Sequence, residues 1–476
     1  MPELCLRARL HESSAGPRVD AAGAGMLGRT QPSGTDPPRG KVQERYMSTQ
    51  PTTDPLPRPK PWAAVTHRDF FLLWSSGVFM NVSMVLRNLI AGQWLYDSTG
   101  SAALLGFLGA VTLMQLPMIL WGGALADRID RKKLMIFTQL SAVVMTGMMF
   151  ALASSGDLAP WHIFGLTALT GMVNTLGGAA RPAMLPRVVP RDLLPQAVTI
   201  LTISGQAAQI GAPVFFGGIY EGLGVATGLG LVTAITFASV VFPFFIKASG
   251  KPETKPKVST WTSLKEGFRF VRHHQLLPGL YGLDLAVTIV SFYRQLFPIF
   301  AKELYGMGAT GTGMLNAFNS MGSIAGSFLV FFTDKLAHKG RLVIIATAIY
   351  AVLLVFFGLN RIFFVGLGLV ALLGLTDSIS MTMRQAIVQL TTPDQLLGRA
   401  SSVRNFAAQG SNSLGQIEVG VMSALIGAGS TMILGGIISI VFVALIWRLM
   451  PGIWRYQYHR GQPADDPAAY AVSSKK

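Results

Sequence analysis

Five ionisable residues interrupt long apolar stretches of the chain, where a charge is costly and therefore usually has a function. Two are arginines, Arg87 and Arg294, and three are acids, Asp284, Asp377 and Glu418. An acid beside an arginine in hydrocarbon keeps its charge, whereas an isolated acid takes up a proton. The pattern favours an acid that binds and releases protons and an arginine that orients an anionic group or competes for the carboxylate. The alternative is a set of static ion pairs.

The distances of three of these residues from the ends of their apolar stretches predict that they lie at a similar depth in the membrane. Arg87 and Arg294 lie about 17 residues, and Glu418 about 18, from the cytoplasmic end expected for their stretches, at about 1.5 Å per residue. All three are therefore expected in the outer half of a membrane. The functional interpretation makes Glu418 a proton carrier, and the structural alternative makes it part of an ion pair that closes an outer gate.

The other two acids are expected nearer the cytoplasmic end. Asp284 and Asp377 would lie at matching depth, where two acids could share a proton or bind a cation. The alternative is that Asp377 pairs with Arg384, two helical turns away on the same face. Uncharged polar residues in the same stretches could donate hydrogen bonds to a substrate, although each alone is more often an interhelical contact; the candidates are Asn81, Asn174 and Tyr293.

Other kinds of chemistry lack the residues that they need. The single cysteine, Cys5, excludes an internal disulfide and a CxxC site, and the seven histidines form no helical pair. There is no P-loop, nucleophile motif or paired cluster of metal ligands. We therefore expect no enzyme activity, no cofactor and no metal. The net charge of +16 would suggest nucleic acid in a soluble protein, but the cations lie in short loops and form no basic–aromatic stripe.

The elements that must position these residues are membrane-crossing helices. Of the 476 residues, 50% are hydrophobic and only 13% charged, with a mean hydropathy of +0.46, outside the range of soluble domains. An all-α integral membrane fold follows, with the lipid bilayer as its main partner. Twelve spans are expected, approximately 70–95, 104–126, 134–154, 161–180, 197–219, 224–246, 277–300, 312–332, 342–358, 363–383, 400–425 and 430–449.

The cations of the loops predict the orientation. With the N-terminus inside, the inner loops carry twenty Lys and Arg residues and the outer loops only two, Lys302 and Arg361. This asymmetry predicts a multi-pass protein with both termini in the cytoplasm. The expected units are two six-helix halves, 67–247 and 276–450, joined by a cytoplasmic linker, 248–275.

The segments outside the halves are polar. The N-terminal tail, 1–66, is expected to be disordered, and residues before Met47 are hypothesised to reflect an upstream start codon, which N-terminal mass spectrometry would test. The linker is expected to contain an amphipathic helix that begins with a capping box of Ser263 and Glu266. The C-terminal tail, 451–476, is expected in the cytoplasm.

The two halves repeat each other. A shift of 207 residues places Arg87 on Arg294 and Asp127 on Asp334, with Arg128 on Lys335. A shift of 203 places Gly171 on Gly374, Asn174 on Asp377, and Arg181 on Arg384. Two blocks nearly in register indicate pseudo-symmetric halves, the organisation of many secondary transporters.

A short basic connector follows the second span. The segment 122–134 reads Gly-Gly-Ala-Leu-Ala-Asp-Arg-Ile-Asp-Arg-Lys-Lys-Leu. It resembles the loop signature Gly-x-x-x-Asp-Arg-x-Gly-Arg-Lys of the major facilitator superfamily, with Asp130 in place of the usual glycine. The resemblance implies two halves that rock around a midplane site. It also implies a gating role for the motif and its repeat; these residues are Gly123, Asp127, Arg128, Arg131, Lys132, Asp334 and Lys335.

Two further segments narrow the resemblance. Trp-Leu-Tyr-Asp-Ser-Thr-Gly-Ser at 94–101 and Ala-Arg-Pro-Ala-Met-Leu-Pro at 180–186 look like the enterobactin-exporter-like branch, whose members are bacterial inner-membrane exporters. The fifth span resembles the glycine–proline motif of proton-driven exporters, although Ala212 and Phe216 stand where glycines are usual. The arginine typical of the fourth helix is missing, because Arg181 is expected in the loop. The matching residues of the fifth span are Gly205, Gly211, Pro213, Gly217 and Gly218.

The resemblance implies a monomeric secondary transporter of the bacterial inner membrane. The leading expectation is proton-linked export of a small molecule that is siderophore-, metabolite- or drug-like. Import or uniport of an organic solute on the same fold is the first alternative, because nothing in the sequence fixes direction. A non-transporting receptor is a further alternative, although neither tail reads as a sensor domain.

Overall fold

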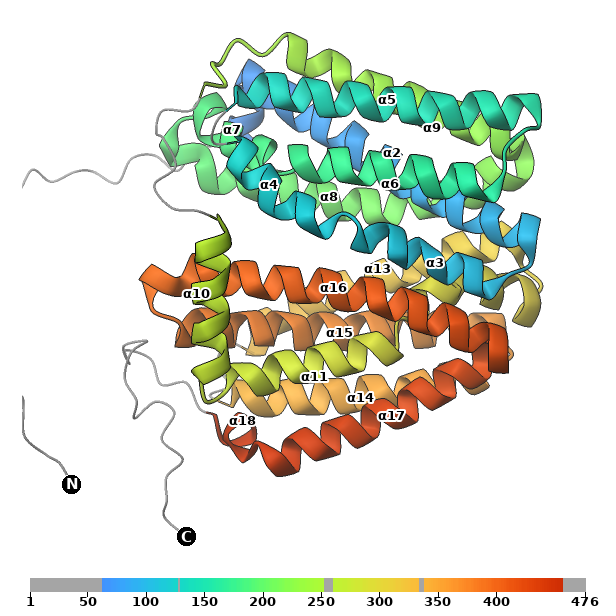
Figure 1. The fold of residues 1–476 in the computed structure, drawn as a ribbon, viewed down its shortest axis with the longest axis vertical. Helices are drawn as coiled ribbons and strands as arrows, with labels where there is room; N and C mark the ends of the chain where they lie inside the picture. Colours follow the sequence, from blue (N-terminus) through green and yellow to red (C-terminus); the bar gives the residue numbers. More distant parts are fainter. Residues whose placement is uncertain (1–61, 127–128, 252–259, 334–337, 457–476) are drawn as a thin grey trace, which may run out of the picture. The chain divides into compact units, whose positions relative to one another are not determined.

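The computed structural model describes residues 62–126, 129–251, 260–333 and 338–456, and every regular element in this part of the chain is helical (Figure 1). The all-α fold class is confirmed. Apolar sequence explains this, because a backbone in hydrocarbon must satisfy its own hydrogen bonds, which a helix does. We call the end of the bundle at which α10 (Thr260–His273) lies the linker end, and the opposite end the distal end.

The first half begins before the expected boundary at residue 67. A 3-10 helix, η1 (Ala63–Thr66), precedes the first long helix, and the Ala64 amide donates to Gln196 Oε1 at 2.9 Å. The remaining elements of this half are α2 (Arg68–Thr99), α3 (Ala102–Leu113), α4 (Leu116–Ala126), α5 (Arg131–Ser155), α6 (Pro160–Gly177), α7 (Ala180–Val188), η2 (Arg191–Leu193), α8 (Leu194–Gly217), the π-helix η3 (Gly218–Gly222) and α9 (Leu223–Phe244).

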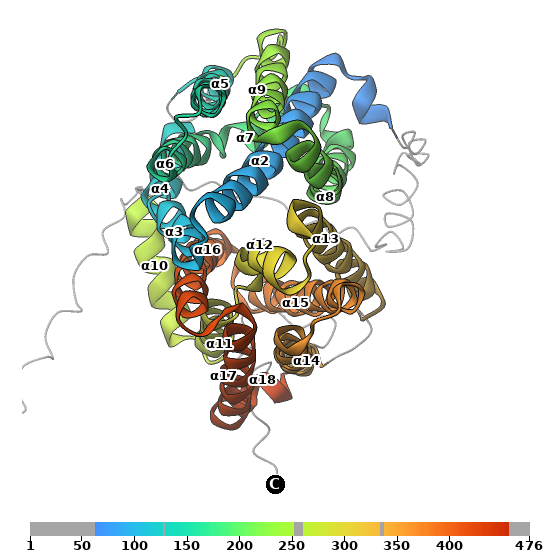
Figure 2. The same cartoon turned by 90° about the vertical axis from the view of Figure 1, so that its right-hand side faces the viewer.

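The second half follows the linker helix α10. In chain order it contains α11 (Leu277–Val290), η4 (Tyr293–Leu296), α12 (Phe297–Ile299), the π-helix η5 (Phe300–Leu304), α13 (Gly308–Thr333), α14 (Lys339–Leu359), α15 (Phe363–Thr391), α16 (Asp394–Ile426), α17 (Ala428–Leu449) and α18 (Pro451–Arg455). Figure 2 shows the two halves as two groups of helices.

Membrane-spanning character is confirmed for much of the described chain. Nine segments are long and apolar enough to cross a bilayer, and one of these, Arg191–Phe244, contains two helices, α8 and α9. The expected number of twelve spans stays a prediction. Each expected span lies on one of the observed helices or across consecutive ones, with ends that differ by up to eight residues, the most at the end of α15.

The second span is broken where the sequence predicted one helix. α3 ends at Leu113 and α4 begins at Leu116, so that Met114 and Gln115 lie between them. Pro117 sits in the first turn of α4, where its missing N–H costs no helical hydrogen bond. The break displaces Gln115 from a regular helical position.

The seventh span is also broken, within the expected range 277–300. α11 ends at Val290, and Ser291 leaves helical geometry with φ −136°. The Tyr350 hydroxyl donates to the freed carbonyl of Ser291 at 3.0 Å, so a neighbouring helix satisfies the break. The chain then continues as η4, which carries Arg294.

The halves meet at the distal end. There α3 packs against α16, and α8 packs against α13, as the two views show together (Figures 1 and 2). Glycine permits the first contact, because a methyl group added at Gly106 would lie 2.7 Å from the carbonyl oxygen of Gln416 and from Cα of Gly420. At the linker end the helices of the two halves diverge in Figure 1.

Polar contacts reinforce the distal closure. Lys302 Nζ and Asp97 Oδ1 form an ion pair at 2.7 Å, and Tyr96 donates to Glu303. The side chain of Glu221 accepts from the amide of Thr310 at 3.1 Å. Between described residues, the side-chain hydrogen bonds and ion pair that join the halves all lie in this distal region.

The linker contains a helix, but its start differs from the expectation. α10 begins at Thr260, so Ser263 lies inside the helix and the capping box with Glu266 is wrong. Glu266 instead forms an ion pair with Arg399 of α16. Val271 is buried in the core of the second half, whereas Phe268 is 58% exposed, as expected for a helix with one apolar face packed only in part.

Candidate functional site

A cavity of about 550 Å³, the central cavity, lies between the halves. α2, α3 and α6 line it on one side, and η4, α12, α13 and α16 line it on the other. Two of its lining residues are cations, Arg87 and Arg294, and no Asp or Glu is among the described residues that line it. Most other polar residues around it are uncharged amides and hydroxyls. Such a lining suits an oxygen-rich solute.

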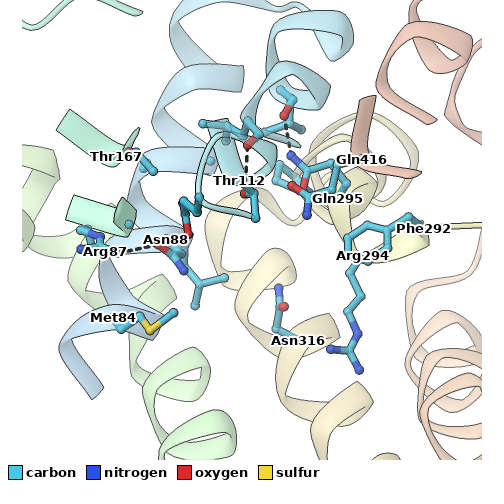
Figure 3. A pocket seen from close by; sticks show the side chains of 18 of the residues that line it. Met84, Arg87, Asn88, Thr112, Thr167, Phe292, Arg294, Gln295, Asn316 and Gln416 are labelled. Carbon is cyan, nitrogen blue, oxygen red and sulfur yellow. Dashed lines mark hydrogen bonds between the residues drawn. The ribbon is translucent and has the colours of Figure 1, made fainter. Parts of the chain in front are cut away.

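Figure 3 shows how the two arginines lie. Arg87 and Asn88 come from α2 on one side, Arg294 comes from η4 on the other, and Asn316 of α13 lies between them. Both arginines therefore line one cavity, from opposite halves, while their roles stay predictions. Arg294 reaches this position because the seventh span is broken at Ser291.

Several polar groups around the central cavity lack a partner within the described protein. Arg87 is 4% exposed, its Nη2 donates to Asn88 Oδ1 at 3.2 Å, and its Nε has no hydrogen-bond acceptor. Asn174 Nδ2 and Thr167 Oγ1, both on α6, are buried without a partner. A buried polar group left unpaired costs about 1–3 kcal/mol. Three such groups at one cavity are available to a bound molecule.

The sequence did not single out several residues of the central cavity. Gln115 enters it because of the break in the second span, and Gly171 leaves room for the Gln115 amide against α6. Gln295 lies next to Arg294 and donates to the carbonyl of Leu105 across the halves at 2.5 Å. Being polar did not distinguish Gln115 and Gln295 from residues that make ordinary interhelical contacts. The Leu116-Pro117 pair was the only local sequence signal of the break in the second span.

A second, small polar cavity of about 20 Å³ lies inside the second half. Asp284 and Asp377 both line it, so the expected proximity of the two acids is what the structure has. Arg384 Nη2 pairs with Asp284 Oδ1 at 2.8 Å, rather than with Asp377 as the alternative held. Asp377 interacts electrostatically with Arg294 and with Arg384. The four charges therefore form a chain from this cavity to the central cavity.

Glu418 lies elsewhere than the sequence suggested. It is absent from the lining of the central cavity, its Oε2 is buried without a hydrogen-bond partner, and neither Arg87 nor Arg294 pairs with it. The exposed Leu414 and Val421 lie four residues before and three residues after it, which places Glu418 beside the outward-facing stripe of α16. The predicted pairing of Glu418 with an arginine is therefore absent from this structure.

Two of the predicted cavity residues also lie elsewhere. Tyr293 is 4% exposed and packs with Phe297 and Tyr350, while its hydroxyl accepts from Asn319 Nδ2 at 2.5 Å. It is thus a core residue next to the central cavity. Asn81 lines a separate pocket of about 290 Å³ inside the first half, which we call the side pocket.

The motif after the second span lies partly outside the described residues, which exclude Asp127, Arg128, Asp334 and Lys335; Gly123 lies within α4. Asp130, which replaces the usual glycine, caps α5 by accepting from the amide of Lys132 at 2.9 Å. Lys132 Nζ donates to the carbonyls of Phe244 and Ile246 at the end of α9, and Arg131 donates to Ala183. These contacts tie three helix ends together at the linker end.

The glycine–proline motif of the fifth span contributes unequally. Gly217 contacts α13 of the other half, since an added methyl group would lie 2.5 Å from Cα of Thr310. The carbonyl of Pro213 faces Gly313, which also lies on α13. Gly205 has Asn81 as its neighbour, whereas Gly211 and Gly218 face open space. Of the motif residues, Pro213 and Gly217 are thus the ones that pack closely against the other half.

The comparison with protein families finds one model that spans most of these elements. The model of the Major Facilitator Superfamily matches residues 71–416. The enterobactin exporter EntS of Citrobacter koseri is 27% identical over 352 residues, which are 73% of this chain and 82% of that protein. The enterobactin exporter EntS of Shigella boydii is 28% identical over 368 residues, covering 76% and 86% respectively.

Solved structures agree on the fold. The nucleoside transporter NupG superposes with a TM-score of 0.68 at 10% identity, covering 80% of this chain and 99% of that one. A bacterial homolog of the human lysosomal transporter Spinster, in an inward-facing and occupied conformation, superposes with a TM-score of 0.62 at 13% identity and covers 83% and 99%. At these identities the likeness concerns the fold.

Proposed function

This chain belongs to the Major Facilitator Superfamily of membrane transporters, and we propose that it exports a small, oxygen-rich organic molecule from the bacterial cytoplasm by proton-linked alternating access. It is a transporter and not an enzyme, and the family resemblance of the sequence is confirmed. Its substrate, direction and coupling ion are the parts that we propose.

The central cavity carries the proposal. It presents two guanidinium groups from opposite halves, together with the unpaired Arg87 Nε, Asn174 Nδ2 and Thr167 Oγ1. An oxygen-rich solute supplies the acceptors that these donors lack, and it contacts both halves at once. Binding that bridges two halves is what alternating access requires of a midplane site.

The conformation supports access from the cytoplasm. The halves are joined at the distal end by α3 with α16 and by the ion pair of Asp97 and Lys302, while the helices diverge at the linker end. The excess of cations in the loops of the linker end favours the cytoplasmic side for that end and for both termini. On this orientation the structure corresponds to a cytoplasm-facing state in a bacterial inner membrane.

Export is favoured by the relatives, which are named enterobactin exporters. Proton coupling is proposed to use the charge chain of the second half. Asp377 interacts with Arg294, which faces the central cavity, and with Arg384, which is held by Asp284. A hydrogen-bonding solute at Arg294 would change the attraction between Arg294 and Asp377, and with it the tendency of that carboxyl group to hold a proton. Glu418 is the second candidate for proton binding.

The same geometry favours the alternative of proton-linked import for one class of solute. A fully ionised anion at Arg294 and a proton on Asp377 stabilise each other, because each reduces the unbalanced charge that the other leaves. Such a solute and the proton would move in the same direction. A weakly charged solute that competes with the proton would move in the opposite direction.

The sign of proton flux tests both candidates. Purified protein in liposomes with an internal pH dye would receive candidate solutes singly, alongside Asp377→Asn, Glu418→Gln and the control Asp157→Asn in an exposed loop. Proton flux opposite to solute flux, lost in Asp377→Asn but kept in the control, supports the export proposal. Flux in the same direction supports import, and solute movement without proton flux refutes proton coupling.

A further inference from the structure

The internal repeat places one helix–helix contact at equivalent positions in both halves, and the two copies of this contact differ in charge. Residues 284 and 77 are related by the shift of 207, and residues 384 and 181 by the shift of 203. In the second half, Asp284 of α11 pairs with Arg384 of α15 at 2.8 Å. In the first half, Gly77 of α2 takes the place of the aspartate and faces Arg181 of α7. The arginine has been kept and its carboxylate is absent.

Arg181 has no acidic partner among the described residues. Its Nη2 donates to Oε1 of Gln139 at 2.9 Å when the Gln139 amide is oriented to satisfy its neighbours, and its Nε is buried with no acceptor. Its Nη1 lies 3.5 Å from the position that a Cβ at Gly77 would occupy. The helix α7 holds Arg181 in place, so the expectation that it lies in a loop is wrong.

The side pocket adjoins the guanidinium of Arg181. It encloses about 290 Å³ between α2, α7 and α8, and Arg181 and Asn81 line it together with Thr202. Apart from Ser204, its other walls are apolar or aromatic, including Val78 and Trp74. Along α2, Gly77 lies ten residues from Arg87, or about 15 Å, toward the linker end, so this pocket is separate from the central cavity.

We propose that the side pocket is a second binding site, in which Arg181 holds the oxyanion of a ligand with an apolar or aromatic body. The ligand anion takes the position that the Asp284 carboxylate occupies in the other half. Charge-assisted hydrogen bonds from a guanidinium suit a carboxylate or a phosphate, and the apolar wall suits the remainder of the molecule. A soluble organic acid and the headgroup of an anionic lipid share this chemistry. The proposal is independent of the direction and coupling proposed above.

The matched substitutions are Gly77→Asp and Gly77→Ala. The aspartate would restore the carboxylate that the second half retains, whereas alanine adds only a Cβ, which would make ordinary contact with Arg181 at 3.5 Å. Both would be made in full-length protein carrying Arg87→Gln and Arg294→Gln, so that anion binding in the central cavity does not contribute. The probe is 1-naphthoate, with its uncharged amide as a control, measured by calorimetry in a neutral detergent.

We expect the alanine protein to bind 1-naphthoate and the aspartate protein to bind it at least about tenfold more weakly, with little binding of the amide to either. Equal binding by the aspartate and alanine proteins would overturn the proposal. If the aspartate protein is not monodisperse, Arg181→Gln decides the question in the same way: weakened binding supports the site, and unchanged binding overturns it.

A lipid arm identifies the source of the anion. The alanine protein would be placed in nanodiscs of phosphatidylcholine alone or with phosphatidylglycerol. Unchanged 1-naphthoate affinity in both supports a soluble acid as the ligand, and loss of affinity only with phosphatidylglycerol supports an anionic lipid. Absence of binding in phosphatidylcholine discs and in detergent overturns the proposal.

Discussion

Closure of the distal end depends on the contact between Gly106 of α3 and Gly420 of α16. Replacing Gly106 with alanine would place a Cβ 2.7 Å from Cα of Gly420 and from the carbonyl oxygen of Gln416. Favourable carbon–carbon contacts lie at about 3.5–4.0 Å, so the helices must separate by roughly 1 Å. Both obstructing atoms belong to backbone, and a flexible side chain cannot relieve the contact.

Overpacking of this kind costs about 1–3 kcal/mol. A cost of about 2 kcal/mol confined to the distally closed state shifts the equilibrium toward the distally open state by about 30-fold. Gly211→Ala is the matched control, since a Cβ at Gly211 meets no atom within 4 Å. The control should leave the equilibrium unchanged.

Distances between spin labels measure the outcome. The single native cysteine, Cys5, would be replaced by serine, and labels would be placed at Ser155 and Ile362, both exposed and in opposite halves near the distal end. We expect a longer distance population in Gly106→Ala and the parent distribution in the control. An unchanged distribution in Gly106→Ala would refute the reasoning that this contact limits opening.

Three further predictions follow from single contacts. Arg87→Gln should raise the KM for an oxygen-rich solute several-fold with a smaller change in kcat, because it removes a cavity charge; transport kinetics in liposomes measure this. Asp284→Asn should lower the melting temperature by removing the ion-pair partner of Arg384, and Arg384→Gln in addition should restore part of it; full additivity of the two losses would contradict the pairing. Burial lowers the pKa of His274 from 6.5, and its Nδ1 accepts from the amide of Leu276, so stability should fall as pH decreases through 6.5; a scan at pH 7.5 and 5.5 should show a smaller difference in His274→Asn.

The sequence predicted positions along the helices better than directions around them. Most helix ends were predicted to within about four residues, because an apolar stretch stops where charged loops begin, but α15 extends eight residues beyond its expected end at 383. Arg87 and Arg294, which the repeat places at equivalent positions, line one cavity, whereas their depth in the membrane stays a prediction. Glu418 shows the limit, because its depth was predicted from a residue count, whereas its direction depends on which neighbours α16 packs against.

The hydropathy pattern also did not predict the helix breaks in the second and seventh spans. Hydropathy is continuous through Gln115 and Ser291, and the breaks depend on tertiary partners such as the Tyr350 hydroxyl. The capping box at Ser263 failed for a related reason, since α10 begins three residues earlier, at Thr260. Short polar signals are weak where packing decides the boundary.

The hydrogen bond between Tyr350 and the Ser291 carbonyl has a mechanical consequence. Because a neighbouring helix holds the freed carbonyl at this break, we expect η4 and α11 to keep their mutual angle when the protein changes conformation. The second span has a different break: the amide of Gln115 bonds to Thr112 and that of Met118 bonds to Gln115, both within the same span. Because the backbone hydrogen bonds at this break stay within the span, we expect it to bend more readily than the break at Ser291. We therefore expect a change in helix angle at the break of the second span rather than at the break of the seventh.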